Sequence, residues 1–197
     1  NNERFPDVRF RKALLLATDI VQIMRDANDA PEMGIETFSY TTTGDFALPQ
    51  SRMKEIFGVK ADAAAYKAER AKRIAEATAI IKDLGMTGKK IGLLNIFAGS
   101  PANEVLALWQ QQLKAIGLNV FLETPPRSQS TARRAKGDYD LQVGTLNLQS
   151  DPIAIFNAQF RTGAPRNYYR YKSAEVDGLI DQAKSEFDKA AAAKLLH

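Results

Sequence analysis

Apolar residues near the start of the chain recur every three or four positions, which is the spacing of one face of an α-helix. The stripe consists of Phe10, Leu14, Ala17, Val21 and Met24. Asp7 precedes it, and an aspartate in that place can accept hydrogen bonds from the free N–H groups of a first helical turn. The pattern predicts one helix from about Val8 to Arg25.

The segment from Asn28 to Gly58 shows no helical or strand periodicity. Proline, glycine and a Thr-Thr-Thr-Gly turn signal interrupt it, and three aromatic residues, Phe38, Tyr40 and Phe46, are scattered through it. We interpret this segment as a long irregular excursion held in place by buried rings.

A second helical stripe runs from about Asp62 to Leu84, and Gly85 follows where a left-handed cap would end the helix. Its apolar positions are Ile74, Ala77, Ile81 and Leu84. Its cations are Lys67, Arg70, Lys72 and Arg73. Because glutamates are interleaved with these cations, we assign them to a solvated helix face.

The middle of the chain reads as strand, helix, strand. The apolar run Ile91 to Phe97 predicts a strand, Ser100-Pro101 predicts a helix start, and Asn119 to Glu123 predicts a second strand. The helix between them has the buried stripe Leu106, Trp109, Leu113 and Ile116. This order is typical of a parallel sheet with a right-handed crossover, so the fold class is α/β.

The last third of the chain continues the α/β pattern. A polar run from Arg127 to Lys136 precedes a strand from Tyr139 to Leu146, and Asp151-Pro152 begins a short helix. A final helix is predicted from about Ala174. Its core positions are Val176, Leu179, Ile180, Ala183, Phe187 and Leu195.

Composition narrows the possible functions. The chain has 197 residues, no cysteine and a single histidine, His197, at its last position, so thiol chemistry and an embedded catalytic imidazole are excluded. The formal net charge is +4, but Lys and Arg are mixed with Asp and Glu along the chain, so nucleic-acid binding is not expected. No run approaches the roughly 18 apolar residues of a membrane span.

Catalytic and metal motifs are also missing from the sequence. Gly85 to Gly88 precedes a strand instead of following one, so it does not form a phosphate-binding loop, and no Gly-x-Ser-x-Gly motif occurs. Asp138 and Asp140 would share one face of a strand, but no third ligand accompanies them. We therefore expect no enzyme activity, no cofactor and no metal site.

Four separated segments resemble one family in the same order. Phe5 to Asp19 is similar to its "F-x-D-x-R-V-R-Q-A…A-x-D" helix, and Arg73 to Gly88 to its "A-x-x-L-L-x-E-A-G…G" helix and turn. Glu104 to Val120 is similar to "I-Q-Q-Q-L-K-x-I-G-I-x-V", and Gly137 to Ile180 to "G-D-F-D-L…G-W…D-P…N…Y-x-N-P-E-V-D-x-L-I". The family is the bacterial extracellular solute-binding proteins of family 5, which serve peptide, oligopeptide and nickel ABC importers.

The resemblance implies a fold and a set of partners. Residues 1–197 would form one lobe, the C-terminal one, of a bilobed type II periplasmic-binding-protein-like fold with a mixed sheet flanked by helices. In the family several hundred residues precede the helix that resembles Asp7 to Ala13, and this chain stops within a helix at His197, so we expect a fragment truncated at both ends, without its signal peptide. The expected partners are a peptide or other small polar solute, the other lobe, and an ABC permease in the membrane.

The resemblance also implies a location and leaves alternatives. The parent protein would be a monomer in the periplasm, or extracellular and lipid-anchored. A stand-alone interaction domain and an α/β enzyme domain are the competing interpretations.

The expected ligand site follows the strand Tyr139 to Leu146, because ligands of α/β lobes bind beyond the carboxyl ends of the strands. The candidate ligand-binding residues are Thr145, Leu146, Asn147, Leu148, Gln149, Asp151 and Asn167. In peptide-binding relatives a tryptophan and an aspartate stand at about the places of Thr145 and Leu148, and the aspartate holds the peptide amino terminus. Leu148 offers no carboxylate, so a peptide with a free amino group is a doubtful ligand.

Several other candidates have ordinary structural explanations. Asp151 is better explained as the cap of the helix at Pro152 than as a ligand contact, and Asn147 and Gln149 are equally suited to satisfy loop backbone. Two groups of arginines suit an acidic ligand or plain solvation, namely Arg127, Arg133 and Arg134, and Arg161, Arg166 and Arg170. Tyr168, Tyr169 and Tyr171 suit either ring stacking with a ligand or a short strand on the core. Trp109 is assigned to the core.

Overall fold

A three-stranded parallel sheet is the centre of the computed structural model, which describes residues 1–27, 46–96, 102–143 and 151–197. The strand order is β2-β1-β3, with β1 at Lys90–Asn95, β2 at Asn119–Glu123 and β3 at Leu141–Val143. Ile91 lies opposite Val120 and Leu93 opposite Leu141. The expected α/β lobe is confirmed. The described strands pair only in parallel, so any antiparallel strand of the expected mixed sheet lies outside them.

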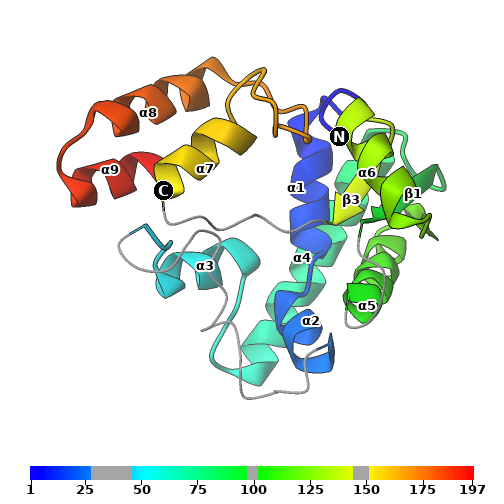
Figure 1. Cartoon of the computed structure of the whole chain (residues 1–197). Coiled ribbons are helices and arrows are strands. Elements are labelled where there is room, and N and C mark those ends of the chain that lie inside the picture. The colour runs from blue at the N-terminus through cyan, green and yellow to red at the C-terminus, as the bar shows by residue number, and fades with distance from the viewer. Residues whose placement is uncertain (28–45, 97–101, 144–150) are drawn as a thin grey trace.

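Three helices cover one face of the sheet and enclose the main core (Figure 1). They are α1 (Val8–Ala17), α4 (Ala63–Asp83) and α5 (Ala102–Ala115). The core consists of Phe10, Ala13, Leu16, Ala17, Ala77, Ile81, Ile91, Leu93, Leu106, Leu113, Ile116, Leu118, Val120 and Leu141. Each fully buried leucine or isoleucine contributes about 1.5–3 kcal/mol, so this cluster is the main source of stability.

The helix α6 (Arg127–Lys136) connects β2 to β3 along the opposite side of the sheet. Its Arg133 forms an ion pair with Glu123 at the end of β2, and the Glu123 carboxylate lies over Gly92 of β1. Any side chain at position 92 would collide with that carboxylate, which explains a glycine in the middle of a buried strand. We expected only a polar run here; the helix was missed because it has no apolar stripe.

A small second core lies beside the first. It joins α2 (Ile20–Ala27) to α3 (Gln50–Phe57) through Ile20, Leu48, Met53 and Phe57. The helix α3 falls inside the segment that we expected to be irregular up to Gly58, so that prediction was wrong for its last part. Of the three rings expected to hold the segment, Phe38 and Tyr40 lie outside the described residues and Phe46 is half-buried.

The single helix predicted from Val8 to Arg25 is in fact two helices. Thr18 adopts an extended conformation after α1, and the Asp19 side chain accepts a hydrogen bond from the Gln22 N–H (2.9 Å) as the cap of α2. The Asp19 carboxylate also accepts a hydrogen bond from the Tyr66 hydroxyl (2.7 Å). Burial and this carboxylate together raise the pKa of Tyr66, so the hydroxyl stays protonated.

Arg70 on α4 holds this break in place. Its guanidinium donates to the carbonyl oxygens of Leu16 (2.9 Å), Ala17 (2.6 Å) and Thr18 (3.1 Å) and lies 3.5 Å from the Asp19 carboxylate. These carbonyls include the last of α1, which have no partner within the helix. Arg70 is buried, as is Arg73, which donates to the Ile56 carbonyl. The prediction of a solvated face was therefore wrong for these two residues.

Three helices at the end of the chain lie together, away from the sheet (Figure 1). They are α7 (Pro152–Gln159), α8 (Ala174–Ser185) and α9 (Lys189–Leu196). We expected one helix from Ala174, but the chain turns at Glu186, and Asp188 caps α9 by accepting from the Ala191 N–H (2.9 Å). Phe187, predicted to be in the core, lies in this turn with its side chain fully exposed.

Within the described ranges, none of the helices has the length and apolar character needed to cross a membrane.

Replacing Arg70 tests how much the break between α1 and α2 depends on one guanidinium. Arg70→Met should lower the free energy of unfolding by about 3–5 kcal/mol, because three carbonyls lose their donor and Asp19 loses its counter-charge in a buried position. Lys72→Met on the exposed side of the same helix is the control and should change stability by less than about 0.5 kcal/mol. Urea denaturation measures both, and equal effects would refute the assigned role of Arg70.

Candidate functional site

The carboxyl ends of the parallel strands meet at one edge of the sheet. There β1 ends at Asn95 and β3 ends at Val143, and the next described residues after Ile96 and Val143 are Ala102 and Asp151. Five of the predicted ligand-binding residues, Thr145, Leu146, Asn147, Leu148 and Gln149, lie outside the described residues, as does the predicted helix start Ser100-Pro101. The described part of this edge consists of the strand ends and the first turns of the helices beside them.

A polar cluster fixes the described part of the edge. The Asn95 side chain donates to the Asn103 side-chain oxygen (2.8 Å), which ties β1 to α5. The Ser130 hydroxyl lies 3.2 Å from the Asn95 carbonyl oxygen and 3.2 Å from the Pro125 carbonyl oxygen, which ties α6 to the same strand. Asn95 and Ser130 are both buried, so this cluster holds the end of β1 against α5 and α6.

Gln142 on β3 is a polar residue of this edge that sequence reasoning missed. It lies opposite Leu94 in the sheet. Its side-chain nitrogen and oxygen are both buried, and neither has a hydrogen-bond partner among the described residues. Such groups cost about 1–3 kcal/mol each when left unpaired. Both atoms are shielded from solvent, so Gln142 is an unsatisfied polar residue within the sheet. A glutamine in a strand gives no sequence signal of this.

Asp151 has the structural role that the sequence left open. Its carboxylate accepts a hydrogen bond from the Ile153 N–H (2.9 Å), and it is the N-cap of α7 with Pro152 in the first turn. The residue is exposed. One carboxylate oxygen is used by the cap, and the other has no partner among the described residues.

Asn167 is buried, and its side chain hydrogen-bonds across the turn between α7 and α8. Its amide nitrogen donates to the carbonyl oxygens of Arg161 (3.0 Å) and Tyr171 (2.7 Å), and its side-chain oxygen accepts from the Tyr171 N–H (3.0 Å). The side-chain nitrogen and oxygen are therefore both engaged, and the residue is only 5% exposed. The structure gives Asn167 a positioning role and does not bring it to the carboxyl edge with Asn95.

The tyrosines after Asn167 lie in turns, so the short strand suggested by Tyr169 and Tyr171 is not present. Tyr169 stacks on Phe160, with ring centroids 5.9 Å apart. The Arg134 guanidinium lies over the Tyr168 ring, 4.2 Å from its centroid, and forms a cation–π interaction with it. Trp109 is half-buried, packs against the main core and donates to the Thr18 hydroxyl (2.9 Å).

The arginines proposed for an acidic ligand have mostly internal partners. Arg133 pairs with Glu123, and the hydrogen bond that Arg133 donates to this carboxylate raises the pKa of Arg133 above its usual value. Arg161 forms a bidentate pair with Asp181 (2.5 and 2.9 Å), and this pair lowers the pKa of the Asp181 carboxyl. Arg170 donates to the Ala135 carbonyl oxygen (2.8 Å) at the end of α6.

Asp138 and Asp140 do share one side of the chain, and both bind Arg4. Arg4 lies 3.1 Å from the Asp138 carboxylate and 2.7 Å from that of Asp140. Asp140 also accepts a hydrogen bond from the Gly92 N–H (2.9 Å). Among the described residues no three His, Cys, Asp or Glu side chains come together to hold a metal ion.

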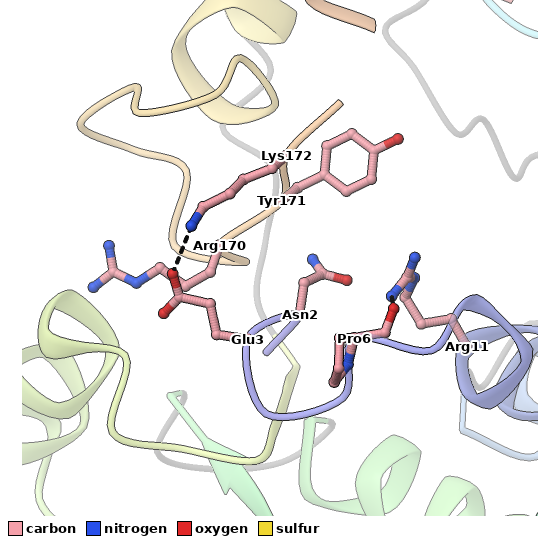
Figure 2. A pocket seen from close by; sticks show the side chains of 7 residues that line it. All are labelled: Asn2, Glu3, Pro6, Arg11, Arg170, Tyr171 and Lys172. Carbon is pink, nitrogen blue, oxygen red and sulfur yellow. Dashed lines mark hydrogen bonds and ion pairs between the residues drawn. The ribbon is translucent and has the colours of Figure 1, made fainter. Parts of the chain in front are cut away.

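A hollow of about 290 Å³ lies between the first residues of the chain and the segment before α8 (Figure 2). Its lining combines three cations, a carboxylate, an amide, a proline and an aromatic ring. These residues are Asn2, Glu3, Pro6, Arg11, Arg170, Tyr171 and Lys172. Sequence reasoning could not find this site, because the two segments are about 160 residues apart.

A second hollow of similar volume lies between α1, α4 and α5. It is lined by Asp19, Arg70 and Gln112, which take part in the break between α1 and α2. The Gln112 side-chain oxygen accepts from the Asp19 N–H (2.9 Å), and its nitrogen donates to the Gln22 side chain (3.0 Å). These polar groups thus bind one another.

Comparison with known proteins gives consistent relatives. Residues 1–168 match the family model described as "Bacterial extracellular solute-binding proteins, family 5 Middle". A curated relative, the probable D,D-dipeptide-binding periplasmic protein DdpA of Escherichia coli, is 31% identical over 110 residues, which cover 53% of this chain and 21% of that protein.

Solved structures share the fold. The ABC transporter substrate-binding protein CtaP of Listeria monocytogenes matches with a TM-score of 0.74 at 19% identity, over 98% of this chain and 38% of that one. OppA of Haemophilus influenzae, in complex with the peptide RPPGFSPFR, matches with a TM-score of 0.73 at 21% identity, over 100% of this chain and 37% of that one. A Thermotoga maritima oligopeptide-binding protein with bound mannohexaose matches with a TM-score of 0.71 at 16% identity, over 98% of this chain and 38% of that one. The chain thus spans about a fifth of the curated relative and under two fifths of these solved chains.

Replacing Asn167 separates a positioning role from a direct ligand contact. Asn167→Ala should lower the free energy of unfolding by about 2–3 kcal/mol without any ligand present, because it leaves the Tyr171 carbonyl and N–H without a partner and removes one of the two donors to the Arg161 carbonyl. Asn157→Ala, in the half-buried middle of α7, is the control and should be neutral or slightly stabilising, because alanine is the better helix former. If Asn167→Ala lowers the free energy of unfolding by less than about 1 kcal/mol in denaturant titrations, the proposed positioning role of Asn167 is contradicted.

Proposed function

The chain belongs to the bacterial extracellular solute-binding proteins of family 5, and from this membership we propose that it is one lobe of the substrate-binding component of an ABC importer. The observation that carries the proposal is the coverage of the fold comparison. Almost the whole of this chain superposes on solved binding proteins, yet it accounts for only 37–38% of the three described above. We therefore assign residues 1–197 to a single lobe, with a partner lobe supplied by the rest of a longer protein.

The ligand would bind at the carboxyl edge of the sheet, between this lobe and its partner. The residues that we propose for contact are Thr145, Leu146, Asn147, Leu148, Gln149 and Asp151. The buried polar cluster of Asn95, Asn103 and Ser130 supports this placement, because it lies where β1 ends. Asn167 is withdrawn as a direct contact, since its own bonds hold a turn.

The proposed solute is an oligopeptide or another small polar molecule. The relatives named above are described with a D,D-dipeptide, a nine-residue peptide and mannohexaose. One scaffold therefore serves ligands of different chemistry, and the residues at the edge decide among them. Leu148 in place of a carboxylate, together with the amides of Asn147 and Gln149, favours a neutral polar solute over one with a free ammonium group.

The proposal includes the remaining partners. The longer protein would act outside the cytoplasmic membrane, in the periplasm or anchored by lipid, and deliver its solute to an ABC permease as a monomer. No chemistry on the solute, no cofactor and no nucleic acid are required for this role. The names of the relatives support it, since each of those described above is a binding protein.

Thermal unfolding with a ligand library tests the clamp. For the longer protein, a cognate solute at 100 times its dissociation constant should add about 2.7 kcal/mol of stability and raise the melting temperature. The same solute should leave the melting temperature of the isolated chain almost unchanged, because half of the binding surface is absent. An equal shift in both proteins would support a stand-alone interaction domain, and turnover of the solute would refute the receptor role.

Restoring a carboxylate tests the proposed ligand position. In the longer protein, Leu148→Asp should improve binding of short peptides with a free amino group by about tenfold or more, because a partly buried ammonium gains a charged acceptor. N-acetylated versions of the same peptides should gain nothing. Titration calorimetry measures both series. Equal changes for free and acetylated peptides would show that Leu148 does not face the amino end.

A further inference from the structure

The hollow between the first residues of the chain and the segment before α8 is formed by a specific set of hydrogen bonds. The backbone N–H and the side-chain amide of Asn2 both donate to the Tyr169 carbonyl oxygen (2.9 and 2.8 Å). Asn167 ties down Tyr171 next to it, and Arg170 between them has a φ of 57°, a left-handed conformation that is unusual for a residue with a side chain. The turn is thus held in one shape and presents Arg170, Tyr171 and Lys172 to the first residues of the chain.

Charge around the hollow is strongly unequal. Arg11, Arg170 and Lys172 contribute three positive charges, and Glu3 contributes the one negative charge of the lining. In Figure 2 Arg170, Lys172 and Glu3 lie on one side of the hollow, Arg11 lies on the other, and Asn2 and Pro6 lie between them. Cations therefore stand on both sides of the space, with a net charge of +2 around it.

Hydrogen-bond donors around the hollow also exceed acceptors. Arg11 donates only through Nη1, to the Phe5 (3.2 Å) and Pro6 (3.5 Å) carbonyl oxygens, and its Nε and Nη2 have no partner among the described residues. Arg170 uses one nitrogen for the Ala135 carbonyl. Lys172 pairs with Glu3 at 3.1 Å, and both side chains are more than half exposed. Such an exposed pair is weak, so Lys172 is available to a competing anion.

Internal roles explain part of this arrangement. Arg11 and Arg170 each bind backbone carbonyls, and Lys172 has a carboxylate partner. These roles leave Arg11 Nε and Nη2 without a partner among the described residues and hold Lys172 only in an exposed ion pair. The Arg170 guanidinium lies against the end of α6 and adds its charge from one side of the hollow, so Arg11 and Lys172 are the cations with capacity for a ligand.

We propose that this hollow binds a small oxyanion, the phosphate or carboxylate group of a small molecule. A planar guanidinium binds two oxygens of such a group at once, and an ammonium on the other side adds a point charge. The Asn1 amino group and side chain reach the carbonyls of Asp140 and Gly137, just before β3 begins. The hollow therefore lies near the amino end of β3, away from the edge proposed for the transported solute, and its binding of an anion does not rest on that proposal.

Titration calorimetry of this chain with inorganic phosphate and with citrate, in a low-salt buffer free of both, tests the site. At least one anion should bind, and Lys172→Gln and Arg11→Gln should each weaken binding by about tenfold. Arg127→Gln is the matched control: it removes the same charge from an exposed residue of α6 that has no ion pair among the described residues, and it should change binding less than about twofold. Because Arg11 also binds the Phe5 and Pro6 carbonyls, Arg11→Gln could change the local structure. Lys172→Gln lacks this role and tests the site independently.

A second pair of variants tests the opposite change, in which anion binding should become stronger. Glu3→Gln removes the one carboxylate of the lining and frees Lys172, so anion binding should strengthen by about fivefold. Glu175→Gln on exposed α8 changes the net charge equally and should have no effect. The proposal is overturned if neither anion binds below about 10 mM, or if the control variants change affinity as much as the variants in the hollow, which would indicate only a general effect of net charge.

Discussion

The parallel pairing of β1 with the strands on both of its sides constrains the position of the other elements of the sheet. Five of the six residues of β1 are buried, so both faces of the strand must be covered. Parallel neighbours cannot be joined by tight turns, so β1 reaches β2 through α5, and β2 reaches β3 through α6 on the opposite side. All three strands then end at the same edge, and this is why a ligand site can form there from separate parts of the chain.

Buried polar side chains decide how the helices meet around that sheet. Arg70 binds the carbonyls where α1 ends and lies beside the aspartate that begins α2. Asn167 binds the carbonyl and the N–H of Tyr171 and so holds the turn that leads into α8. A fully bonded buried polar group specifies one arrangement, because any other leaves it unpaired at a cost of about 1–3 kcal/mol. Arg70 therefore positions the second core, and Asn167 positions the hollow between the first residues of the chain and the segment before α8.

The two proposed binding surfaces have different chemistry and different origins. The carboxyl edge, where Asn147 and Gln149 are proposed to contact the ligand beside the buried cluster of Asn95 and Ser130, suits a neutral polar solute held between two lobes. The hollow beside Arg11 offers an excess of cationic donors and suits an oxyanion. The first follows from the topology of every α/β lobe, and the second follows from one turn in which Arg170 is held in a left-handed conformation.

Local pattern in the sequence determined the fold class, the strands β1 and β2, the helix α4 and the caps at Asp7 and Asp151, because each depends on residues a few positions apart. It also carried the family resemblance. Tertiary structure alone decided that α1 and α2 are separate, that Arg70 and Arg73 are buried, and that Phe187 is exposed. Periodicity cannot distinguish one long helix from two in phase, and it cannot show where a cation finds its carbonyl partners. The break and the burial of the two arginines depend on contacts such as those of Arg73 with the Ile56 carbonyl and of Arg70 with the Ala17 carbonyl, which join residues 17 and 53 positions apart, and only folding brings such residues together.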